Sequence, residues 1–298
     1  MSFNEKTKTT LIPQVEEGES PSEKPILTIL YQDEYLVAVD KPAGLFVHRS
    51  YMDKDEIYFA LQLVRDQIGQ YVYPVHRLDR PTSGVLLFAL TKEAASKLSD
   101  AFANKTGETS LNTDGEYKQQ NEDNSQALSM VKTYYALVRG HLEAKDEQGN
   151  VVKRGVIDYP LKEKLDKLGD KYVSHNKEAQ QAKSFFSVVK QATLPIPLGK
   201  YETIRYSLVK LTPVTGRRHQ LRRHLAHLRH PIIGDINYGD NKQNPFFIQH
   251  FGFKRLMLIA KSLQFNHPVT GKRLTIEVEF DQQWHSIFNE FNWSEANT

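Results

Sequence analysis

The segment at residues 76–90 constrains the fold more than any other part of the sequence. In it, a charged stretch leads directly into six consecutive apolar residues at 85–90. A short apolar run that follows a polar turn with Pro81 and Gly84 is typical of a buried strand. Asp79 stands in the turn just before this run. The sequence therefore predicts a buried strand with a carboxylate on the constrained loop that leads into it.

Asp79 lies between two arginines, Arg77 and Arg80, whose opposite charge would keep its carboxylate ionised. An ionised carboxylate on a constrained loop can act as a nucleophile or as a general base. The same residues would also suit a surface loop whose charges pair only to stabilise the fold, because loops often carry such clusters. Spacing alone leaves both interpretations open.

The composition limits the class of protein. No cysteine occurs in the 298 residues, which excludes disulfides, thiolate catalysis and cysteine-ligated zinc, and which suits a reducing cytoplasm. No apolar run is long enough to span a bilayer, and residues 1–24 lack the apolar core of a secretory signal. We expect residues 1–24 to be a disordered tail and 25–298 to form one domain. Residues 106–129 predict a flexible insertion, and 163–183 a mobile connection.

Apolar spacing predicts more strands than helices. The expected strands are 26–31, 35–39, 85–90, 132–140, 185–190, 204–211 and 274–280, and the expected helices are 55–69, 91–104 and 222–228. In the first helix, Ile57, Leu61, Val64 and Ile68 would form one apolar stripe. Hairpin links dominate over long helical crossovers, so we expect an α+β fold with a mainly antiparallel sheet.

The expected strand at 132–140 has one face that could bind a nucleobase. Its alternation places Lys132, Tyr134 and Ala136 on one face and Tyr135 on the other. An aromatic ring on such a face could stack on an extruded base and leave its hydroxyl free for a proton. Half-buried tyrosines are common in strands, so a purely structural tyrosine is the more frequent case.

Positive charge is concentrated at residues 217–230, although the net charge of the chain is only +3. This segment holds five arginines and four histidines, which suit the binding of phosphates and of a carboxylate. His224, His227 and His230 have the spacing of zinc ligands on a helix, but the nearby arginines would repel a cation and Pro231 would end the helix. We therefore expect no metal site and predict that these histidines face solvent or RNA.

Three functions are compatible with these residues. One is an RNA-modifying enzyme that uses Asp79 and no cofactor, and another is a metal-independent nuclease with His76 and His219 as acid and base. The third is an RNA-binding module without catalysis. A nuclease leaves the Asp79 loop and the Tyr134 strand unexplained. A binding module has no need of a carboxylate, which weakens phosphate binding.

Four motifs, in this order, resemble those of the RluA-type pseudouridine synthases over residues 26–280. They are KPxGxxVH at 41–48, HRLDxxTSG at 76–84, KxYxAxVxG at 132–140 and TGRxHQLRxH at 215–224. The resemblance implies the pseudouridine synthase fold, which is an α+β fold with a mainly antiparallel mixed central sheet flanked by helices and loops. It also implies an isomerase that acts on RNA without a cofactor or metal. The HPIxGD string at 230–235 matches the family too, and we interpret it as a structural turn.

The resemblance assigns roles to individual residues. Asp79 would be the catalytic residue, Tyr134 the active-site tyrosine, and Arg222 the partner of Asp79. The residues that would bind the RNA substrate are His76, Arg77, Arg80, Lys132, Arg217, His219 and Leu221. Of these, Arg77 would enter the RNA helix and occupy the space of the extruded uridine.

Strings outside the shared motifs, such as VRDQIGQ at 64–70, favour the branch of the family that modifies uridine 65 of tRNA over its ribosomal-RNA enzymes. We therefore expect a tRNA partner and a cytoplasmic monomer without membrane contact. One residue departs from the family: Ile259 stands where these synthases have histidine in a Leu-His-Ala string. We expect this substitution to affect local packing.

Overall fold

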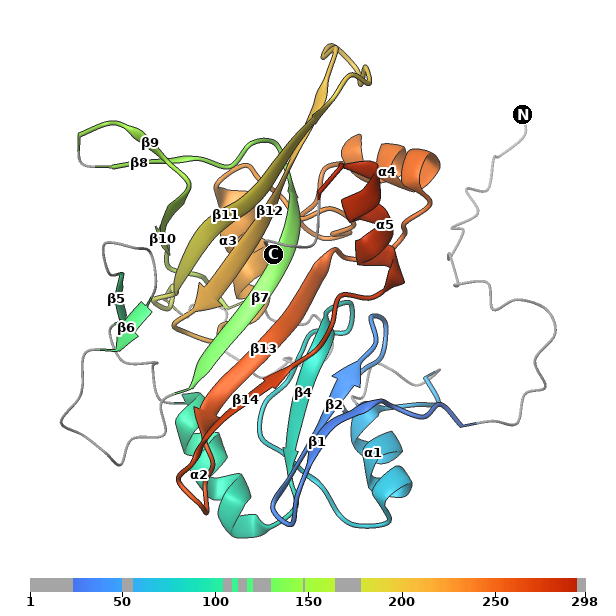
Figure 1. Ribbon diagram of the computed structural model, residues 1–298, viewed down its shortest axis with the longest axis vertical. Helices are drawn as coiled ribbons and strands as arrows, with labels where there is room; N and C mark the ends of the chain where they lie inside the picture. Colours follow the sequence, from blue (N-terminus) through green and yellow to red (C-terminus); the bar gives the residue numbers. More distant parts are fainter. Residues whose placement is uncertain are drawn as a thin grey trace, which may run out of the picture.

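A ten-stranded sheet forms the framework of the protein (Figure 1). The computed structural model describes residues 24–49, 56–103, 109–111, 117–119, 130–146, 148–163 and 178–293. The strands of the sheet are β1 (Ile29–Gln32), β2 (Leu36–Lys41), β3 (Tyr73–Pro74), β4 (Ser83–Ala89), β7 (Val131–Arg139), β10 (Arg154–Asp158), β11 (Lys183–Leu194), β12 (Ile204–Pro213), β13 (Leu258–Asn266) and β14 (Arg273–Glu277). Their order is β1-β2-β4-β13-β7-β12-β11-β10, with β14 paired to β13 and β3 to β4.

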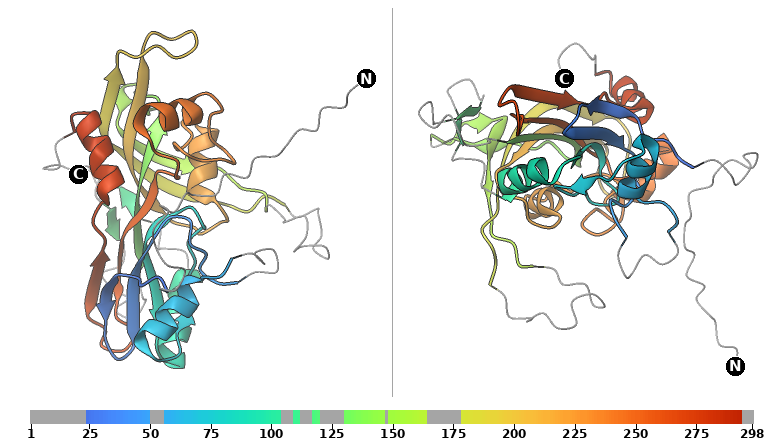
Figure 2. Two further views of the ribbon diagram at one scale, coloured as in Figure 1. Left: turned by 90° about the vertical axis from the view of Figure 1, so that its right-hand side faces the viewer. Right: turned by 90° about the horizontal axis from the view of Figure 1, so that it is seen from below.

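Helices cover both sides of this sheet. They are α1 (Ala60–Ile68), α2 (Lys92–Ala103), α3 (Gln220–His227), α4 (Gln243–Phe251) and α5 (Gln282–Glu290). Figure 2 shows α2 and α3 on one side of the sheet and α5 on the other. None of the helices in the described part of the chain is both long and apolar enough to cross a bilayer.

The pairing of the strands confirms the expected mainly antiparallel, mixed sheet. Most neighbours are antiparallel, but β4 and β13 run parallel where Ile259 pairs with Ser83 and Ala260 with Gly84. Strand β13 thus lies between β4 and β7. Both of these strands hold predicted site residues or adjoin the loops that hold them. The sequence did not lead us to expect β13, although this strand joins the two halves of the sheet.

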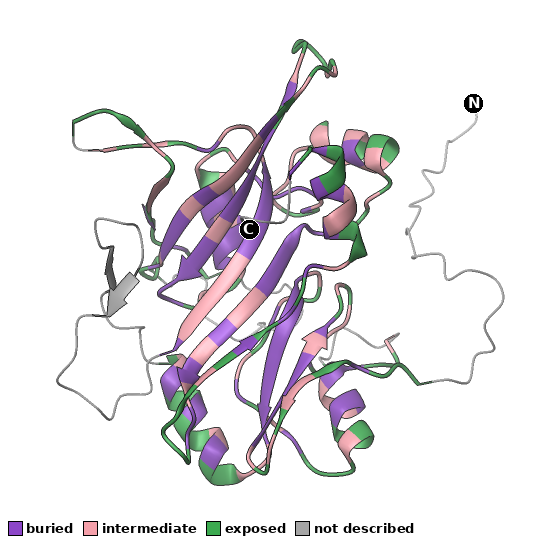
Figure 3. Cartoon of the chain, viewed as in Figure 1, coloured by how far each residue is buried: buried purple, intermediate pink, exposed green. Residues whose placement is uncertain are grey.

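Strand β4 is buried along its whole length, as the apolar run predicted. Alternate residues join different apolar clusters: Val85 and Leu87 pack in the cluster that contains Leu98 of α2, whereas Leu86 and Phe88 pack in the cluster that contains residues of α1. Both faces of the strand are covered, which explains why apolar residues occupy successive positions. The burial extends through the middle of the sheet (Figure 3).

The expected helix at 55–69 is shorter than predicted. Of its expected stripe, Leu61, Val64 and Ile68 pack together in one apolar cluster, whereas Ile57 does not. Helix α1 begins at Ala60, so Ile57 lies outside it and is 76% exposed. The buried residues are Ala60, Leu63 and Val64. The cause is the loop at 46–47, whose carbonyls accept the backbone N–H groups of Ala60 and Leu61 and so fix the start of the helix. The predicted end is right, since Gly69 caps α1 in a left-handed conformation.

Other elements agree with the sequence in type but not always in length. Thr91 caps α2 as expected, because its hydroxyl accepts the N–H of Ala94 at 3.2 Å. Strands β11 and β12 extend beyond the predicted ranges and form a long hairpin that projects from the body (Figure 1). Strand β10 and helices α4 and α5 were not expected from the sequence. On either side of Asp146, strands β8 (Ala144–Lys145) and β9 (Val151–Val152) pair antiparallel and form a separate two-stranded sheet.

Three segments expected to lack order lie mainly outside the described residues. Within 106–129, only the backbones of β5 (Thr109–Leu111) and β6 (Tyr117–Gln119) are described, and these pair antiparallel. Of the expected tail at 1–24, only Lys24 is described, and it forms an ion pair with Asp66. In the expected connection at 163–183, the prediction is wrong for 178–183, because Gln180 and Leu161 exchange two backbone hydrogen bonds and β11 already begins at 183.

Candidate active site

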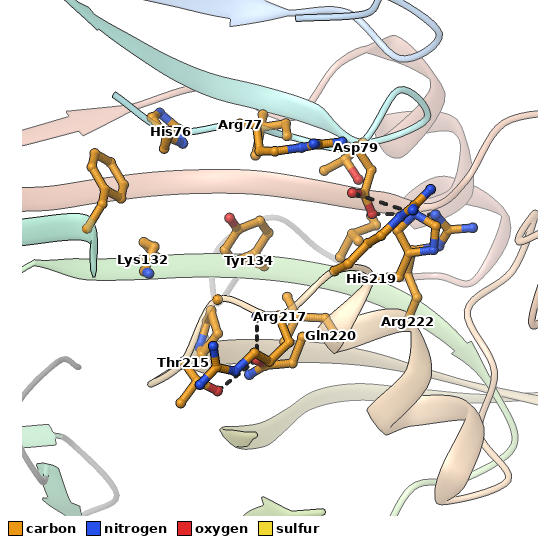
Figure 4. Close-up of a pocket in the computed structure, with 18 of the residues that line it drawn as sticks. His76, Arg77, Asp79, Lys132, Tyr134, Thr215, Arg217, His219, Gln220 and Arg222 are labelled. Carbon is orange, nitrogen blue, oxygen red and sulfur yellow. Dashed lines mark hydrogen bonds and ion pairs between the residues drawn. The ribbon is translucent and has the colours of Figure 1, made fainter. Parts of the chain in front are cut away.

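A cavity of about 740 Å³ lies between the loop before β4, the end of α2, strand β7 and the start of α3 (Figure 4). Asp79 reaches it from the loop, Tyr134 from β7 and Arg222 from α3. These segments are far apart in the sequence, and β13, which lies between β4 and β7, keeps their strands at a fixed separation. Of the expected substrate-binding residues, the cavity is lined by His76, Arg77, Lys132, Arg217, His219 and Leu221.

The carboxylate of Asp79 faces α3. Its Oδ2 lies 3.4 Å from Nη1 of Arg222, and its Oδ1 lies 3.8 Å from Nε2 of His219. The side chain of Asp79 is 19% exposed, so one edge stays open to the cavity. A carboxylate held by a guanidinium on one side and open to a pocket on the other can act on a bound molecule as nucleophile or base.

Arg80 does not hold Asp79, which corrects the expectation from the sequence. Its guanidinium forms an ion pair with Glu56, donates from Nε to the carbonyl of Gly44 at 3.0 Å, and lies 4.5 Å from the ring centre of Phe46. Arg80 is not among the residues that line the cavity. Adjacent residues on a loop point in different directions, so the positive charge beside Asp79 comes from α3 instead.

Lys41 stabilises the loop that carries Asp79 through hydrogen bonds to backbone carbonyls. This lysine is fully buried at the end of β2, and its Nζ donates to the carbonyls of Pro42, Leu45 and Arg80 at 2.8–3.1 Å. Burial lowers the pKa of Lys41 to about 7, although the charge of Asp79 acts to raise it. Three acceptors match the three N–H groups of an ammonium, so this geometry fits the charged lysine. The KPxGxxVH motif at 41–48 includes Lys41, but the sequence did not predict this role for it.

The loop before β4 depends on a glycine at a close approach of two strands. Gly84 has a φ of +110°, and a Cβ built there would lie 2.3 Å from the carbonyl oxygen of Ala260. Only glycine allows β4 and β13 to pair here while the chain turns towards Asp79. Next to this point, Ile259 is 2% exposed and belongs to the large apolar cluster. The departure from the family's histidine is therefore accommodated as core packing.

Arg222 is held in place by a second carboxylate, which the sequence analysis did not assign to the site. Asp235 accepts hydrogen bonds from Nε of Arg222 at 2.7 Å and from Nη2 at 2.8 Å. It also accepts the N–H groups of Asn237 and Tyr238. Burial acts to raise the pKa of Asp235, but the hydrogen bonds from Arg222 and from these N–H groups hold the pKa below its ordinary value. Interpreting 230–235 as only a structural turn is therefore wrong for Asp235.

His219 occupies a strained backbone position between these groups. Its φ is +55°, in the left-handed region that costs a residue with a side chain about 1–2 kcal/mol. Its ring is fixed by Tyr238, whose hydroxyl lies 3.0 Å from Nδ1. Burial, with the charges of Arg222 and Arg218, lowers the pKa of His219 despite the attraction of Asp79. The imidazole thus stays mainly neutral at physiological pH.

The opposite wall of the cavity contains Tyr134. It lies on the face of β7 predicted from the alternation, while Tyr135 packs on Phe280 on the other side of the sheet, with ring centres 5.4 Å apart. Burial and the charge of Asp79 raise the pKa of Tyr134 well above its ordinary value. Its hydroxyl is therefore protonated at physiological pH and can donate a hydrogen bond to a bound group.

His76 closes the far end of this wall. Its Nε2 accepts the N–H of Leu87 at 2.9 Å, and its ring stacks on Phe102 with centres 4.4 Å apart. Burial lowers the pKa of His76 to about 3, so its imidazole is uncharged and a poor general acid near neutral pH. This argues against a nuclease that would use His76 and His219 as acid and base.

Comparison with known proteins agrees with this geometry. A family model described as RNA pseudouridylate synthase matches residues 35–227. The chain belongs to the RNA pseudouridylate synthase family. It is thus an enzyme that isomerises uridine in RNA, as the four motifs predicted.

Individual relatives cover nearly the whole chain. The tRNA pseudouridine synthase C of Vibrio cholerae is 48% identical over 271 residues, which are 91% of this chain and 98% of that protein. The protein of the same name from Haemophilus influenzae is 47% identical over 268 residues, which are 90% of this chain and 99% of its own. Among solved structures, human RNA Pseudouridylate Synthase Domain Containing 1 covers 88% of this chain and 86% of its own, at 22% identity and a TM-score of 0.59. The shared fold confirms the predicted fold class.

The three histidines considered as zinc ligands point to three different partners in this synthase. His224 is fully buried and lies 3.1 Å from the hydroxyl of Ser184, which contradicts the expectation that it faces solvent or RNA. His227 is exposed and stacks on Tyr159. His230 lies 2.8 Å from the carbonyl of Arg139. Spacing along a helix placed them near one another, but packing directs each ring elsewhere.

The synthase presents its cavity as a positively charged cleft with an aromatic wall. Arg217 and Arg218 lie in the loop before α3, and Lys132 lies beside Phe102 at 5.7 Å from its ring centre. A buried glutamine, Gln220, fixes the α3 entry loop by accepting hydrogen bonds from the hydroxyl of Thr215 and the N–H of Arg217. Positive charge, a stacking surface and a volume of this size together suit a nucleotide within RNA.

Proposed function

We propose that this protein converts one uridine of tRNA, at the end of the T-stem, to pseudouridine. The observation that carries the proposal is the contact between Asp79 and Arg222 inside a cavity that has Tyr134 on its opposite wall. The identity of 46–48% to proteins named tRNA pseudouridine synthase C supports tRNA over ribosomal RNA. We also propose that the protein acts as a cytoplasmic monomer, since a chain without cysteine suits the reducing cytoplasm.

The first step is to bring the uridine out of its stack. A base within a stem is sheltered, and extruding it costs a few kcal/mol. Arg77 is exposed at the rim of the cavity, next to the loop that carries Asp79. From there its guanidinium would enter the stem and stack where the uridine had been. The positive charges of Arg217 and Arg218 would hold the phosphates on the opposite rim.

The second step breaks the bond between ribose C1′ and base N1. Asp79 initiates it, either by attack of its carboxylate on C1′ or by removal of a proton from C2′. Arg222 fixes the direction of the carboxylate, because Asp235 holds the guanidinium and leaves Nη1 for Asp79. The electrons of the broken bond remain on the uracil. The freed base then turns within the cavity and joins C1′ through C5. On the first route the bond between Asp79 and C1′ breaks at this point, and on the second Asp79 returns the proton to C2′.

The last step removes the proton from C5 of the uracil. Tyr134 faces the cavity, where its ring would stack on the base while its hydroxyl lies near the reacting edge. The raised pKa of Tyr134 keeps the hydroxyl protonated, so it would accept the proton of C5 while its own proton passes to N1 of the same base, directly or through solvent. The reaction is an isomerisation, and its atoms balance without an oxidant or a group donor.

The proposal is tested with unmodified tRNA transcripts that carry tritium at C5 of uridine. Purified protein should release tritium, and mapping of the product should place pseudouridine at one site in the T-stem. Asp79→Asn serves as the matched control and should release none. If tritium is released from ribosomal RNA fragments but not from tRNA, the substrate is wrong. If neither RNA releases tritium, the protein only binds RNA, and the proposed reaction is rejected.

A further inference from the structure

A stack of two aromatic rings is exposed on the outward side of α3. The rings of Tyr159 and His227 have centres 3.6 Å apart and planes inclined by 17°. Tyr159 is 41% exposed and His227 is also exposed. Tyr159 directly follows β10, and His227 is the last residue of α3. Two elements that are far apart in the sequence thus present one continuous platform, which we define as Tyr159 and His227.

The fold does not need this stack to attach β10 to α3. The backbone N–H of Tyr159 donates to the carbonyl of Ala182 at 3.1 Å, and its own carbonyl lies 3.2 Å from Nε2 of His224. Burial lowers the pKa of His224 to about 4, so this ring is neutral, and its Nδ1 is left to accept the hydroxyl of Ser184. Tyr159 is therefore fixed through its backbone, while its ring projects outward onto His227.

The platform continues the positive face of α3 away from the active site. Arg223 and His227 are one helical turn apart, so their side chains leave α3 on the same side. The residues between them that are buried, such as His224 and Leu225, face the core instead. Arg223 is half-buried and His227 exposed, which leaves both within reach of a ligand on the surface. The outer side of α3 thus combines a guanidinium, an imidazole and a phenol.

The distance from the catalytic carboxylate suits a neighbouring part of the same RNA. His219 precedes α3, and its Nε2 lies 3.8 Å from Asp79. The eight residues from there to His227 span about 12 Å at a helical rise of about 1.5 Å per residue. This corresponds to roughly three or four base pairs of a duplex. An RNA stem whose uridine enters the cavity would therefore pass along the outer side of α3.

We propose that the platform of Tyr159 and His227, together with Arg223, holds the sugar-phosphate backbone of the RNA stem next to the extruded uridine. This inference rests on the proposed function and adds a binding surface to it. The imidazole and the guanidinium contact phosphates, and the tyrosine hydroxyl contacts a ribose 2′-hydroxyl, which are the groups that an A-form stem presents on its outside. A stack that served packing alone would leave RNA affinity unchanged.

The test compares platform variants with exposed rings elsewhere. His227→Ala and Tyr159→Ala should each raise KM for tRNA about 5- to 20-fold and leave kcat within about twofold, because neither residue touches the reacting atoms. His250→Ala is the matched control for the histidine, since His250 is exposed and stacks on Phe246 of α4. Tyr201→Ala is the control for the tyrosine, being 63% exposed on the projecting hairpin. Equal effects in the controls, or unchanged KM in both platform variants, would overturn the proposal.

A second variant keeps the test valid if an alanine variant unfolds. Arg223→Gln leaves the stack intact and should reduce the slope of log Kd against log salt by about one, as expected for one lost phosphate contact. An unchanged slope contradicts the proposed backbone contact. Direct binding separates this inference from the proposed reaction: tRNA binding that His227→Ala weakens, in a protein that releases no tritium, supports the platform and rejects the reaction. Full tritium release with wild-type KM in the platform variants supports the reaction and rejects the platform.

Discussion

Asp235 holds Arg222 through two parallel hydrogen bonds, of 2.7 Å to Nε and 2.8 Å to Nη2. This arrangement uses one edge of the guanidinium and leaves Nη1 to face Asp79 at 3.4 Å. Removal of one partner from a buried charge pair typically costs about 3–5 kcal/mol, because the other charge stays uncompensated. The carboxylate that orients the arginine is therefore as important for the site as the arginine itself.

Asp79→Asn should abolish turnover and leave tRNA binding nearly intact. The amide has the same shape as the carboxylate but lacks the charged oxygen, so we expect tritium release to fall by at least about 10³-fold. Filter binding should give a Kd within about threefold of the wild type. Normal turnover in this variant would reject the assignment of Asp79.

Arg222→Lys should lower kcat/KM by about 100-fold or more. An ammonium cannot span the two oxygens of Asp235 and face Asp79 at the same time, and loss of a buried charge-pair contact costs about 2–5 kcal/mol. Asp235→Asn should reduce activity in the same direction, because it leaves the guanidinium unheld. Arg205→Lys, at an exposed position of β12, is the matched control. Wild-type rates in Arg222→Lys would show that the planar guanidinium is not needed.

Tyr134→Phe should separate stacking from proton transfer. The ring is retained, so Kd for tRNA should change by less than about threefold, while turnover should fall by about 10²-fold or more through loss of the hydroxyl. Because the pKa of Tyr134 is raised, the wild-type rate should show no ionisation of this phenol below its ordinary pKa of 10.0. The measurement is a pH profile of single-turnover rates for both proteins. A rate for Tyr134→Phe equal to that of the wild type would leave the hydroxyl without a role.

Lys41 should make stability increase with pH above neutrality. Its folded-state pKa of about 7 lies below the ordinary value of 10.5, so between these values the unfolded chain binds more protons. Raising the pH therefore favours the folded state, by about 5 kcal/mol in total. Urea unfolding of the wild type and of Lys41→Met should show this increase only in the wild type. Lys97→Met, at a surface ion pair with Glu93, is the control and should retain it. Parallel curves for all three proteins would contradict the prediction.

Gly84→Ala should destabilise the protein by about 2–4 kcal/mol, since the new Cβ would overlap a backbone carbonyl that cannot move aside. Gly44→Ala is a close control, because Gly44 also has a positive φ, of +93°, but no atom within 4 Å of the added Cβ. It should lose only the conformational part, about 1–2 kcal/mol. Thermal or urea unfolding checks both. An equal loss in the two variants would mean that the approach of β4 to Ala260 is not the cause.

Local patterns in the sequence were sufficient to predict several elements of the fold. The apolar run before residue 90 predicted β4, because a strand covered on both faces has no polar side. The alternation around Tyr134 predicted which face of β7 it occupies, since side chains of a strand alternate by geometry. These inferences succeed because burial and strand geometry leave a regular trace in adjacent residues.

The resemblance to known motifs predicted which residues would gather around one cavity. Asp79, Tyr134 and Arg222 do line it together. The second partner of Arg222, Asp235, was not predicted, because it follows an apolar turn whose sequence looks purely structural. Its position just after Ile232 and Ile233 was the signal in the sequence for a buried carboxylate, and a buried charge needs a partner.

The sequence by itself determined the class of fold, the buried strand next to Asp79 and the family to which the protein belongs. Only the tertiary structure decided that Arg80 turns to Glu56, that the buried Lys41 donates to the carbonyl of Arg80, and that Asp235 holds Arg222. The physical reason is that a charged side chain pairs with whichever partner the packing brings within reach. That partner is set by contacts between distant segments, which leave no regular pattern along the chain.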